Sequence, residues 1–297
     1  MSNALLTGLP RSGTTISCEL LNKLPDTVAL DEPMPRRQLM GFPPPSLLER
    51  VAHRLGSHRS PAVSRGAAAR NIGEFLASTR RSLLEEGVAT SKHVDGQVFG
   101  GKVADSTTSD GLRQRLAAKG SIQIAKKLEP DFTLVVKHNA SFTALLDELV
   151  DHRVYAIVRN PLATLLSWQS VPFPIRDGHV PYGENLDPTL AAGLAALDDP
   201  VERQLHVLGW FFGRFDTLLP KEAVVRYEDV VSSGGQALAV VTPAAANLGE
   251  PLENRNRAAA TPETRELAAR LLDRDGAHWN FYSRESVEAL VAESEIR

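Results

Sequence analysis

The sequence has one cysteine, no long hydrophobic run and nearly balanced charge. The cysteine, Cys18, has no partner for an internal disulfide, which favours a reducing compartment. No stretch of 18 apolar residues and no signal-peptide pattern occur, so we expect a cytoplasmic protein without a membrane anchor. The net charge of -3 argues against a general nucleic-acid-binding protein, since that role usually shows a strong basic excess.

Metal-binding patterns are also missing from the sequence. The histidines show no spacing such as His-x-x-x-His with a nearby acid, so we expect no metal. The 297 residues, 42% of them hydrophobic, are enough for one α/β domain that spans residues 1–297. Arginine outnumbers lysine and alanine is abundant, which is typical of a bacterial source. The sequence does not indicate an oligomeric state.

Short apolar runs alternate with helix-compatible runs along the chain. This order predicts a parallel sheet covered by helices on both faces. The expected strands are residues 4–6, 27–30, 133–136, 154–158 and 223–226. The expected helices are residues 14–23, 112–128, 142–150, 162–170, 201–218 and 262–274. Proline-rich insertions near 35–66 and 172–200 fit neither pattern, and we expect them to cover a substrate, because long segments of this kind are usually functional.

The most informative stretch is a glycine-bounded loop between the first strand and the first helix. It reads Gly8-Leu9-Pro10-Arg11-Ser12-Gly13-Thr14-Thr15. Nucleoside triphosphatases have G-x-x-x-x-G-K-S/T here, and Thr14 replaces their lysine. Backbone amides and the helix N-terminus still form an anion site, and Arg11 supplies a cation inside the loop. A nucleotide without a γ-phosphate or a metal would therefore suit this loop better.

A second anion site is predicted after the buried strand 154–158. The strand ends at Arg159, Asn160 is a natural N-cap, and proline follows at the first helical position. Arg159 therefore lies at the carboxyl edge of the sheet, where open α/β folds bind ligands. Ser167 lies about two turns into the following helix, and we expect Arg159 and Ser167 to bind a second phosphate together. The alternative for Arg159 is an ion pair with an acidic helix.

With these two motifs the chain resembles the sulfotransferases that use 3′-phosphoadenosine 5′-phosphosulfate (PAPS). Their 5′-phosphosulfate loop is similar to residues 8–15, and their 3′-phosphate motif, an arginine with a serine eight residues later, is similar to Arg159 and Ser167. Their late strand ending in Tyr-Glu-Asp is similar to residues 224–230. The three motifs follow the expected order over residues 1–230. The pattern is closest to bacterial carbohydrate or small-molecule and protein-tyrosine sulfotransferases.

The resemblance implies a P-loop-containing three-layer α/β fold and in-line transfer of a sulfuryl group from PAPS to a hydroxyl or amine. The product would be adenosine 3′,5′-bisphosphate (PAP), and no metal takes part. It assigns the nucleotide to Arg11, Ser12, Gly13, Thr14, Thr15, Arg159, Ser167 and Tyr227. Arg11 also has a catalytic role, because negative charge develops on the 5′-phosphate oxygen as the sulfuryl group leaves. The alternative for Tyr227 is a place in the core, and Glu228 and Asp229 are expected to cap the following helix.

Two residues are candidates for the general base that accepts the proton of the acceptor. Glu32 follows the strand 27–30 and would lie at the same sheet edge as Arg11, within reach of an attacking hydroxyl. Its alternative roles are to cap a turn or to pair with Arg36 or Arg37. His138 is the rival base, but it follows Lys137 directly where cytosolic sulfotransferases have Lys-x-His, and this shift can turn the ring away. His138 would then orient the acceptor or donate a hydrogen bond to the leaving oxygen, with Lys137 neutralising the sulfuryl group.

Other functions remain open at the level of sequence. A P-loop kinase-like nucleotide phosphotransferase, with Arg11 in place of the missing lysine, is the alternative to a sulfotransferase. A nucleotide-binding protein without activity is a third possibility. The acceptor is equally open among small molecules, carbohydrates and peptides, because covering loops set substrate choice and the fold does not. Arg255 and Arg257, or Ser283 and Arg284, are candidates to close over the nucleotide.

Overall fold

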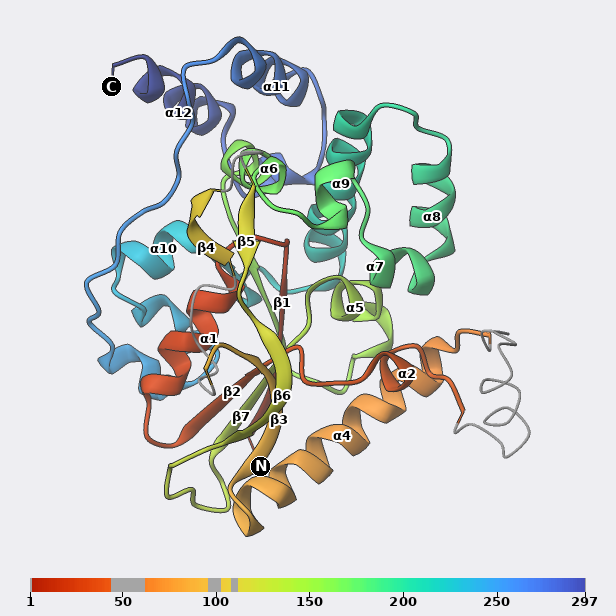
Figure 1. Cartoon of the computed structure of the whole chain (residues 1–297), viewed down its shortest axis with the longest axis vertical. Coiled ribbons are helices and arrows are strands. Elements are labelled where there is room, and N and C mark those ends of the chain that lie inside the picture. Colours follow the sequence, from red (N-terminus) through yellow and green to blue (C-terminus); the bar gives the residue numbers. More distant parts are fainter. Residues whose placement is uncertain (1, 44–61, 96–102, 108–111, 297) are drawn as a thin grey trace.

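A computed structural model describes residues 2–43, 62–95, 103–107 and 112–296 of the chain. In this part of the chain five parallel strands form a central sheet in the order β2-β7-β1-β8-β9 (Figure 1). Their bounds are β1 Ser2–Gly8, β2 Thr27–Asp31, β7 Thr133–Lys137, β8 Val154–Val158 and β9 Val224–Arg226. The expected α/β fold with a central parallel sheet is confirmed, and the expected strands differ from these by at most two residues at either end.

Helices cover both faces of the sheet because successive apolar side chains on each strand point to opposite sides. Leu5 and Val136 pack into one hydrophobic core with α4, α5, α6 and α9, and Leu6 and Val135 pack into another with α1 and α10. The helices are α1 Thr14–Lys23, α2 Arg36–Leu39, α4 Arg65–Glu85, α5 Asn139–Ala144, α6 Pro161–Gln169, α7 Pro181–Leu186, α8 Pro188–Ala195, α9 Pro200–Leu218, α10 Tyr227–Ser232, α11 Pro262–Leu272 and α12 Arg284–Ile296.

The connections place a ligand-binding position next to β1. The strands β2 and β7 lie on one side of β1, while β8 and β9 lie on the other. The chain therefore changes direction across the sheet between β7 and β8, and open α/β sheets bind ligands at such a switch point, beyond the carboxyl ends of the strands. The glycine-bounded loop after β1 lies at this point.

The helix expected over residues 112–128 is wrong. The segment contains two short strands, β5 Arg113–Arg115 and β6 Ala118–Gln123, which pair with β4 Val103–Thr107 and β3 Val88–His93 in two antiparallel hairpins. Pairing with β3, about 30 residues earlier, decides the conformation of β6, whose own sequence carries little β-propensity. Ser91 of β3 accepts a hydrogen bond of 2.9 Å from the backbone N–H of Asp31, which fixes this hairpin beside the end of β2.

The two proline-rich insertions have different outcomes. Most of the segment near 35–66 lies outside the described residues, apart from α2 and the start of α4. Residues 172–200 form a 3-10 turn at Pro174–Asp177 followed by α7 and α8. Helix α9 holds this turn, since Gln204 donates to the carbonyl of Arg176 (2.7 Å) and Arg203 to that of Asp177 (2.8 Å). The segment is thus a packed wall and not an open loop.

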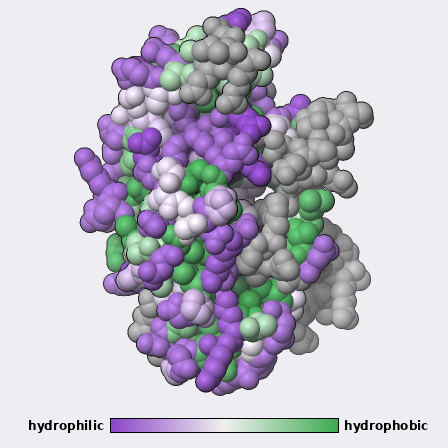
Figure 2. Space-filling model, turned by 90° about the vertical axis from the view of Figure 1, so that its left-hand side faces the viewer, coloured by the Kyte–Doolittle hydropathy of each residue, from purple (hydrophilic) through white to green (hydrophobic). Residues whose placement is uncertain are grey.

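The surface of the molecule is more polar than the two hydrophobic cores on either side of the sheet. The face in Figure 2 is covered mainly by hydrophilic side chains, with hydrophobic residues visible in patches between them. Among the helices that the structure describes, none combines the length and apolar character needed to cross a bilayer.

Candidate functional site

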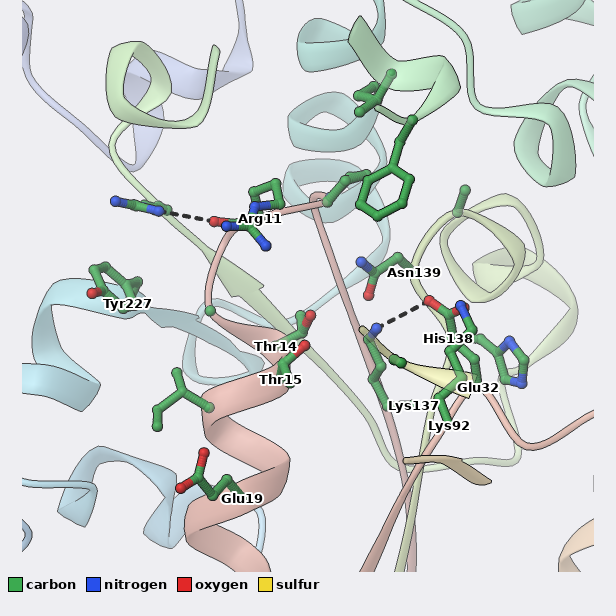
Figure 3. A pocket seen from close by; sticks show the side chains of 18 of the residues that line it. Arg11, Thr14, Thr15, Glu19, Glu32, Lys92, Lys137, His138, Asn139 and Tyr227 are labelled. Atoms are coloured by element: carbon green, nitrogen blue, oxygen red, sulfur yellow. Dashed lines mark hydrogen bonds and ion pairs between the residues drawn. The ribbon is translucent and has the colours of Figure 1, made fainter. Parts of the chain in front are cut away.

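The carboxyl ends of the strands open into a cleft of about 1090 Å³ (Figure 3). One end, which we call the anion end, is lined by Arg11, Thr14, Thr15 and Tyr227. The other, which we call the acceptor end, is lined by Glu32, Lys92, Lys137 and His138 together with residues 173–182. Asn139 lies between the two ends in Figure 3. The cleft therefore places six of the eight predicted nucleotide residues and both candidate bases in one continuous space.

Two glycines allow the loop after β1 to fold closely against its neighbours. Gly8 has φ 152° and a Cβ there would collide with the carbonyl oxygen of Ile157. Gly13 has φ 95°, and a Cβ there would lie 2.5 Å from the ring of Tyr227. The structure also holds Arg11 at φ 69°, a left-handed conformation that is uncommon outside glycine. The loop is thus shaped by residues far away in the sequence.

Helix α1 begins directly behind this loop and has no side-chain cap. The amides of its first turn have no partner within the helix, so they form an anion site together with the positive end of the helix dipole. Thr14 and Thr15 line the cleft at this turn, and Arg11 lies beside them. These donors fit a tetrahedral anion without a lysine in the loop.

Ser12 and Ser167 have different positions from those expected. The hydroxyl of Ser12 is buried and donates to the carbonyl of Ile157 at 2.7 Å, so it fixes the loop to β8. The hydroxyl of Ser167 accepts a hydrogen bond of 3.2 Å from Nε of Arg11. In the structure this serine orients Arg11, and its expected role in binding a second phosphate together with Arg159 stays a prediction. Both serines support the loop from behind and neither lines the cleft.

Arg159 lies at the tip of β8 and connects three segments. Its guanidinium donates to the carbonyl of Arg11 (3.0 Å), the carbonyl of Arg255 (2.5 Å) and Oδ1 of Asn256 (2.7 Å). It also stacks over the ring of Tyr227, with 4.7 Å between the guanidinium carbon and the ring centroid. These contacts hold the guanidinium of Arg159 at the anion end, next to the loop that carries Arg11.

Tyr227 packs between the loop and the segment that follows residue 250. Its ring lies against Gly13, and its hydroxyl accepts a hydrogen bond of 3.1 Å from the backbone of Arg255. Glu228 does not cap α10 as expected. It accepts hydrogen bonds from the backbone of Asn160 (3.0 Å) and the hydroxyl of Tyr282 (2.7 Å), which ties the end of β8 to the C-terminal part of the chain.

At the acceptor end, Glu32 leaves the tip of β2 with φ 46°. Its carboxylate pairs with Lys92 and lies 3.1 Å from Nζ of Lys137 (dashed in Figure 3). The expected alternatives, an ion pair with Arg36 or Arg37, are not what the structure shows. The side chain of Glu32 is 27% exposed, so an acceptor molecule in the cleft has access to it.

Lys137 is the most deeply buried cation of the site. Its side chain is 1% exposed, and Nζ lies 3.0 Å from Oδ1 of Asp31 and 3.1 Å from Glu32. Burial alone would lower the pKa of Lys137, but the carboxylates of Asp31 and Glu32 outweigh it and raise this pKa above its ordinary value. Lys137 therefore stays charged throughout the physiological pH range.

Two further lysines reach the same place from the β3–β6 hairpin. Lys92 and Lys119 are directly opposite each other in the ladder, and Nζ of Lys119 donates to the carbonyl of Met34 at 2.6 Å. Burial, and then the charge of Lys92, lower the pKa of Lys119. Lys92 pairs with Glu32, as Lys137 does, so the hairpin adds a second lysine to this carboxylate. Sequence reasoning missed them because it did not find the hairpin.

His138 points away from Arg11 and the threonines in Figure 3. Its Nε2 accepts a hydrogen bond of 3.2 Å from the backbone N–H of Met34, and its ring meets the edge of Phe142. Burial lowers the pKa of His138 to about 3; the charge of Glu32 opposes this shift, and the charges of Lys137 and Lys119 add to it. The imidazole is therefore neutral at pH 7, with one nitrogen already engaged.

Asn139 is the second group that the sequence interpretation missed. It begins α5, lines the cleft, and lies between the loop and the Glu32–Lys137 pair in Figure 3. Its Oδ1 is buried and has no hydrogen-bond partner in the described part of the chain. Buried polar atoms are normally satisfied, so this amide is placed to bind a group that enters the cleft.

Comparisons with known proteins add little to this picture. No family model and no curated protein matches the chain. Among solved structures, the chain is similar to the crystal structure of sulfotransferase STF1 from Mycobacterium tuberculosis, with 12% sequence identity, over 98% of this chain and 76% of that chain. The TM-score is 0.30, a value too low to carry an argument. The function is therefore inferred from the topology and the site of this chain itself.

Proposed function

We propose that the protein is a PAPS-dependent sulfotransferase. One observation carries the proposal: a single cleft has a lysine-free phosphate loop at one end and a carboxylate held by lysines at the other. A nucleotide bound at the anion end would direct its sulfuryl group toward Glu32, where an acceptor hydroxyl can reach it. The five-stranded α/β topology, with the loop at its switch point, supports the same function.

The anion end offers two sources of positive charge for the two ends of the nucleotide. Arg11, with the first-turn amides of α1 and the hydroxyls of Thr14 and Thr15, suits the 5′-phosphosulfate. Arg159 lies beside the Tyr227 ring and the segment that contains Arg255, and we assign the 3′-phosphate to it. The 3.0 Å contact between Arg159 and the backbone of Arg11 keeps the two sites at a short, fixed separation.

The transfer step uses the acceptor end. The acceptor oxygen attacks sulfur and forms the new O–S bond, while the bond from sulfur to the 5′-phosphate oxygen breaks and leaves its electron pair on that oxygen. Glu32 takes the acceptor proton. Arg11 and the loop amides stabilise the charge that develops on the leaving oxygen, and Lys137 offsets the charge of the sulfuryl group.

We assign the base to Glu32 and not to His138. The carboxylate of Glu32 is partly exposed in the cleft beside Lys137. The imidazole of His138 uses Nε2 to accept from Met34, and its pKa of about 3 makes it a weak base at neutral pH. His138 instead holds the backbone that follows Glu32.

Thermal unfolding in the presence of nucleotides tests the proposal against the kinase alternative. PAP without Mg²⁺ should stabilise the native protein by about 2.7 kcal/mol at 100 times its dissociation constant. Arg11→Gln should abolish most of this effect, whereas Arg81→Gln, on the exposed face of α4, should keep it. Stabilisation by ATP with Mg²⁺ and not by PAP would overturn the proposal in favour of a nucleotide phosphotransferase.

A further inference from the structure

The outer half of the acceptor end is walled by hydrocarbon. Its side chains come from two parts of the chain: residues 173–182, and Met34 together with Leu116 in the turn before β6. The side chains that form the wall, which we call the apolar wall, are Met34, Leu116, Phe173, Ile175, Val180 and Tyr182. Such a surface binds carbon skeletons, since each buried methylene is worth about 0.8 kcal/mol in removal from water.

Two members of the apolar wall mark its mouth. Leu116 is 46% exposed and Tyr182 is 41% exposed, and they belong to the small set of large hydrophobic side chains that the described surface leaves in contact with water. Met34, Ile175 and Val180 are buried deeper in the wall. The accessible part of the apolar wall is therefore formed by Leu116, Phe173 and Tyr182, with the three buried side chains packed behind it.

The charged side chains at this end already have partners in the protein. Lys92 and Lys137 pair with Glu32, and Lys119 donates to the carbonyl of Met34. His179 lies 3.3 Å from Glu184 through Nδ1. A molecule with many hydroxyls would lose hydrogen bonds to water against the apolar wall without regaining them from these groups, which is costly.

The apolar wall is held in place before any ligand arrives. Arg203 and Gln204 of α9 donate to the carbonyls of the 3-10 turn, and Glu184 accepts a hydrogen bond of 2.6 Å from the backbone of Val180. Gly178 adopts φ 77°, and a Cβ there would collide with Arg203. Binding thus requires little ordering of the wall, which favours a rigid acceptor of fixed shape.

We propose that the acceptor is an alcohol on an apolar skeleton, such as a substituted phenol, and not a sugar or an acidic peptide. This inference rests on the proposed sulfotransferase function and names the substrate class of the same site. The hydroxyl lies at Glu32, and the skeleton extends along the apolar wall toward Leu116 and Tyr182. The cleft volume of about 1090 Å³ leaves room for such an acceptor beside the nucleotide.

The kcat/KM values of a series of 4-alkylphenols, with PAPS as donor, measure how much the apolar wall contributes to acceptor recognition. We expect kcat/KM to rise by up to about 4-fold for each added methylene, the full value of one buried methylene, until the chain reaches the mouth. Methyl glucoside and an acidic tyrosine peptide serve as the competing acceptor classes and should be transferred at least about 100-fold less efficiently than the best phenol.

Variants at the mouth test the contribution of the apolar wall to acceptor binding separately from the transfer step. Leu116→Ser and Tyr182→Ser should lower kcat/KM for the long alkylphenols by more than for unsubstituted phenol, because phenol does not reach the mouth. Both positions are exposed, so folding should be retained. Val150→Ser is the matched control, since Val150 is 80% exposed and lies outside the cleft.

The outcomes distinguish this inference from the proposed function. If PAP binds but sulfate goes to the glucoside or the peptide, or to no probe, the apolar acceptor is wrong and the nucleotide site stands. A flat response to alkyl length, or no change in the mouth variants, also overturns the apolar acceptor. If PAP itself does not bind, the proposed function fails and the acceptor class with it.

Discussion

Asp31 and Lys137 form a buried ion pair at the acceptor end. Replacing Asp31 by asparagine tests how much this pair contributes to the free energy of unfolding. Both side chains are 1% exposed and their charged atoms are 3.0 Å apart. At an effective dielectric constant of about 20, the Coulomb attraction at 3.0 Å is about 5 kcal/mol before the cost of desolvation is subtracted. Asp31→Asn keeps the shape but leaves the ammonium of Lys137 with Glu32 as its main carboxylate partner.

We expect Asp31→Asn to lower the free energy of unfolding by about 3–5 kcal/mol, as is usual when one partner of a buried pair is removed. The double variant Asp31→Asn, Lys137→Met should recover most of this loss, because an apolar side chain of similar length then replaces the buried charge. Urea denaturation at pH 7 of the wild type, both single variants and the double variant completes a double-mutant cycle, which gives the coupling energy of the pair.

The sign of the pH dependence adds a second check on the same pair. The pKa of Lys137 is raised in the folded protein, so its stabilising contribution is fully present below the unfolded pKa and is lost only as the pH rises through the folded value. The wild type should therefore keep this contribution up to alkaline pH. A loss of less than about 1 kcal/mol in Asp31→Asn, or strictly additive effects in the double variant, would refute the reasoning.

The other predictions concern catalysis and acid stability. Glu32→Gln should lower kcat by about 100-fold or more with an unchanged dissociation constant for PAP in calorimetry, whereas His138→Gln should keep a larger share of kcat; the reverse order would identify His138 as the base. Asn139→Ala should lower kcat by about 10-fold or more and leave PAP affinity nearly unchanged, and equal losses in both would indicate a role in nucleotide binding. His278 is buried with no hydrogen-bond partner on either ring nitrogen in the described chain, and burial, then Arg284 and Arg274, lower its pKa to about 4. Its neutral form is favoured in the fold, so His278→Phe should flatten the loss of stability that occurs as the pH falls from about 6.5 to 4; an unchanged profile in urea titrations would contradict this.

The sheet could be read from the sequence because its strands are buried on both faces. Runs such as 154–158 are continuously apolar, and this local signal is enough to locate a parallel strand. The loop at residues 8–13 could also be predicted from the sequence. Gly8 and Gly13 lie where the Cβ of any other residue would collide with a neighbour. Both features depend on short stretches of chain in which the residue types alone indicate the local structure.

The acceptor end was harder to predict because its parts meet only through tertiary contacts. Lys92 and Lys119 reach Glu32 through a hairpin whose strands are half exposed and far apart in the sequence, so neither strand has a clear pattern of its own. Ser167 was placed at the site by its spacing, but its partner depends on the direction in which α6 packs. The partner of a side chain is a property of packing, which a motif does not contain.

The contacts of Arg159 have a consequence for how the site is assembled. Its guanidinium donates to the backbone carbonyls of Arg11 and Arg255, which lie far apart in the sequence. All three recognisable motifs lie within residues 1–230, yet a fragment that stopped there would lack Arg255 and the residues before it that line the cleft. The proposed nucleotide pocket therefore needs residues beyond the last motif, and a chain truncated before Arg255 should fail to bind PAP although its motifs are intact.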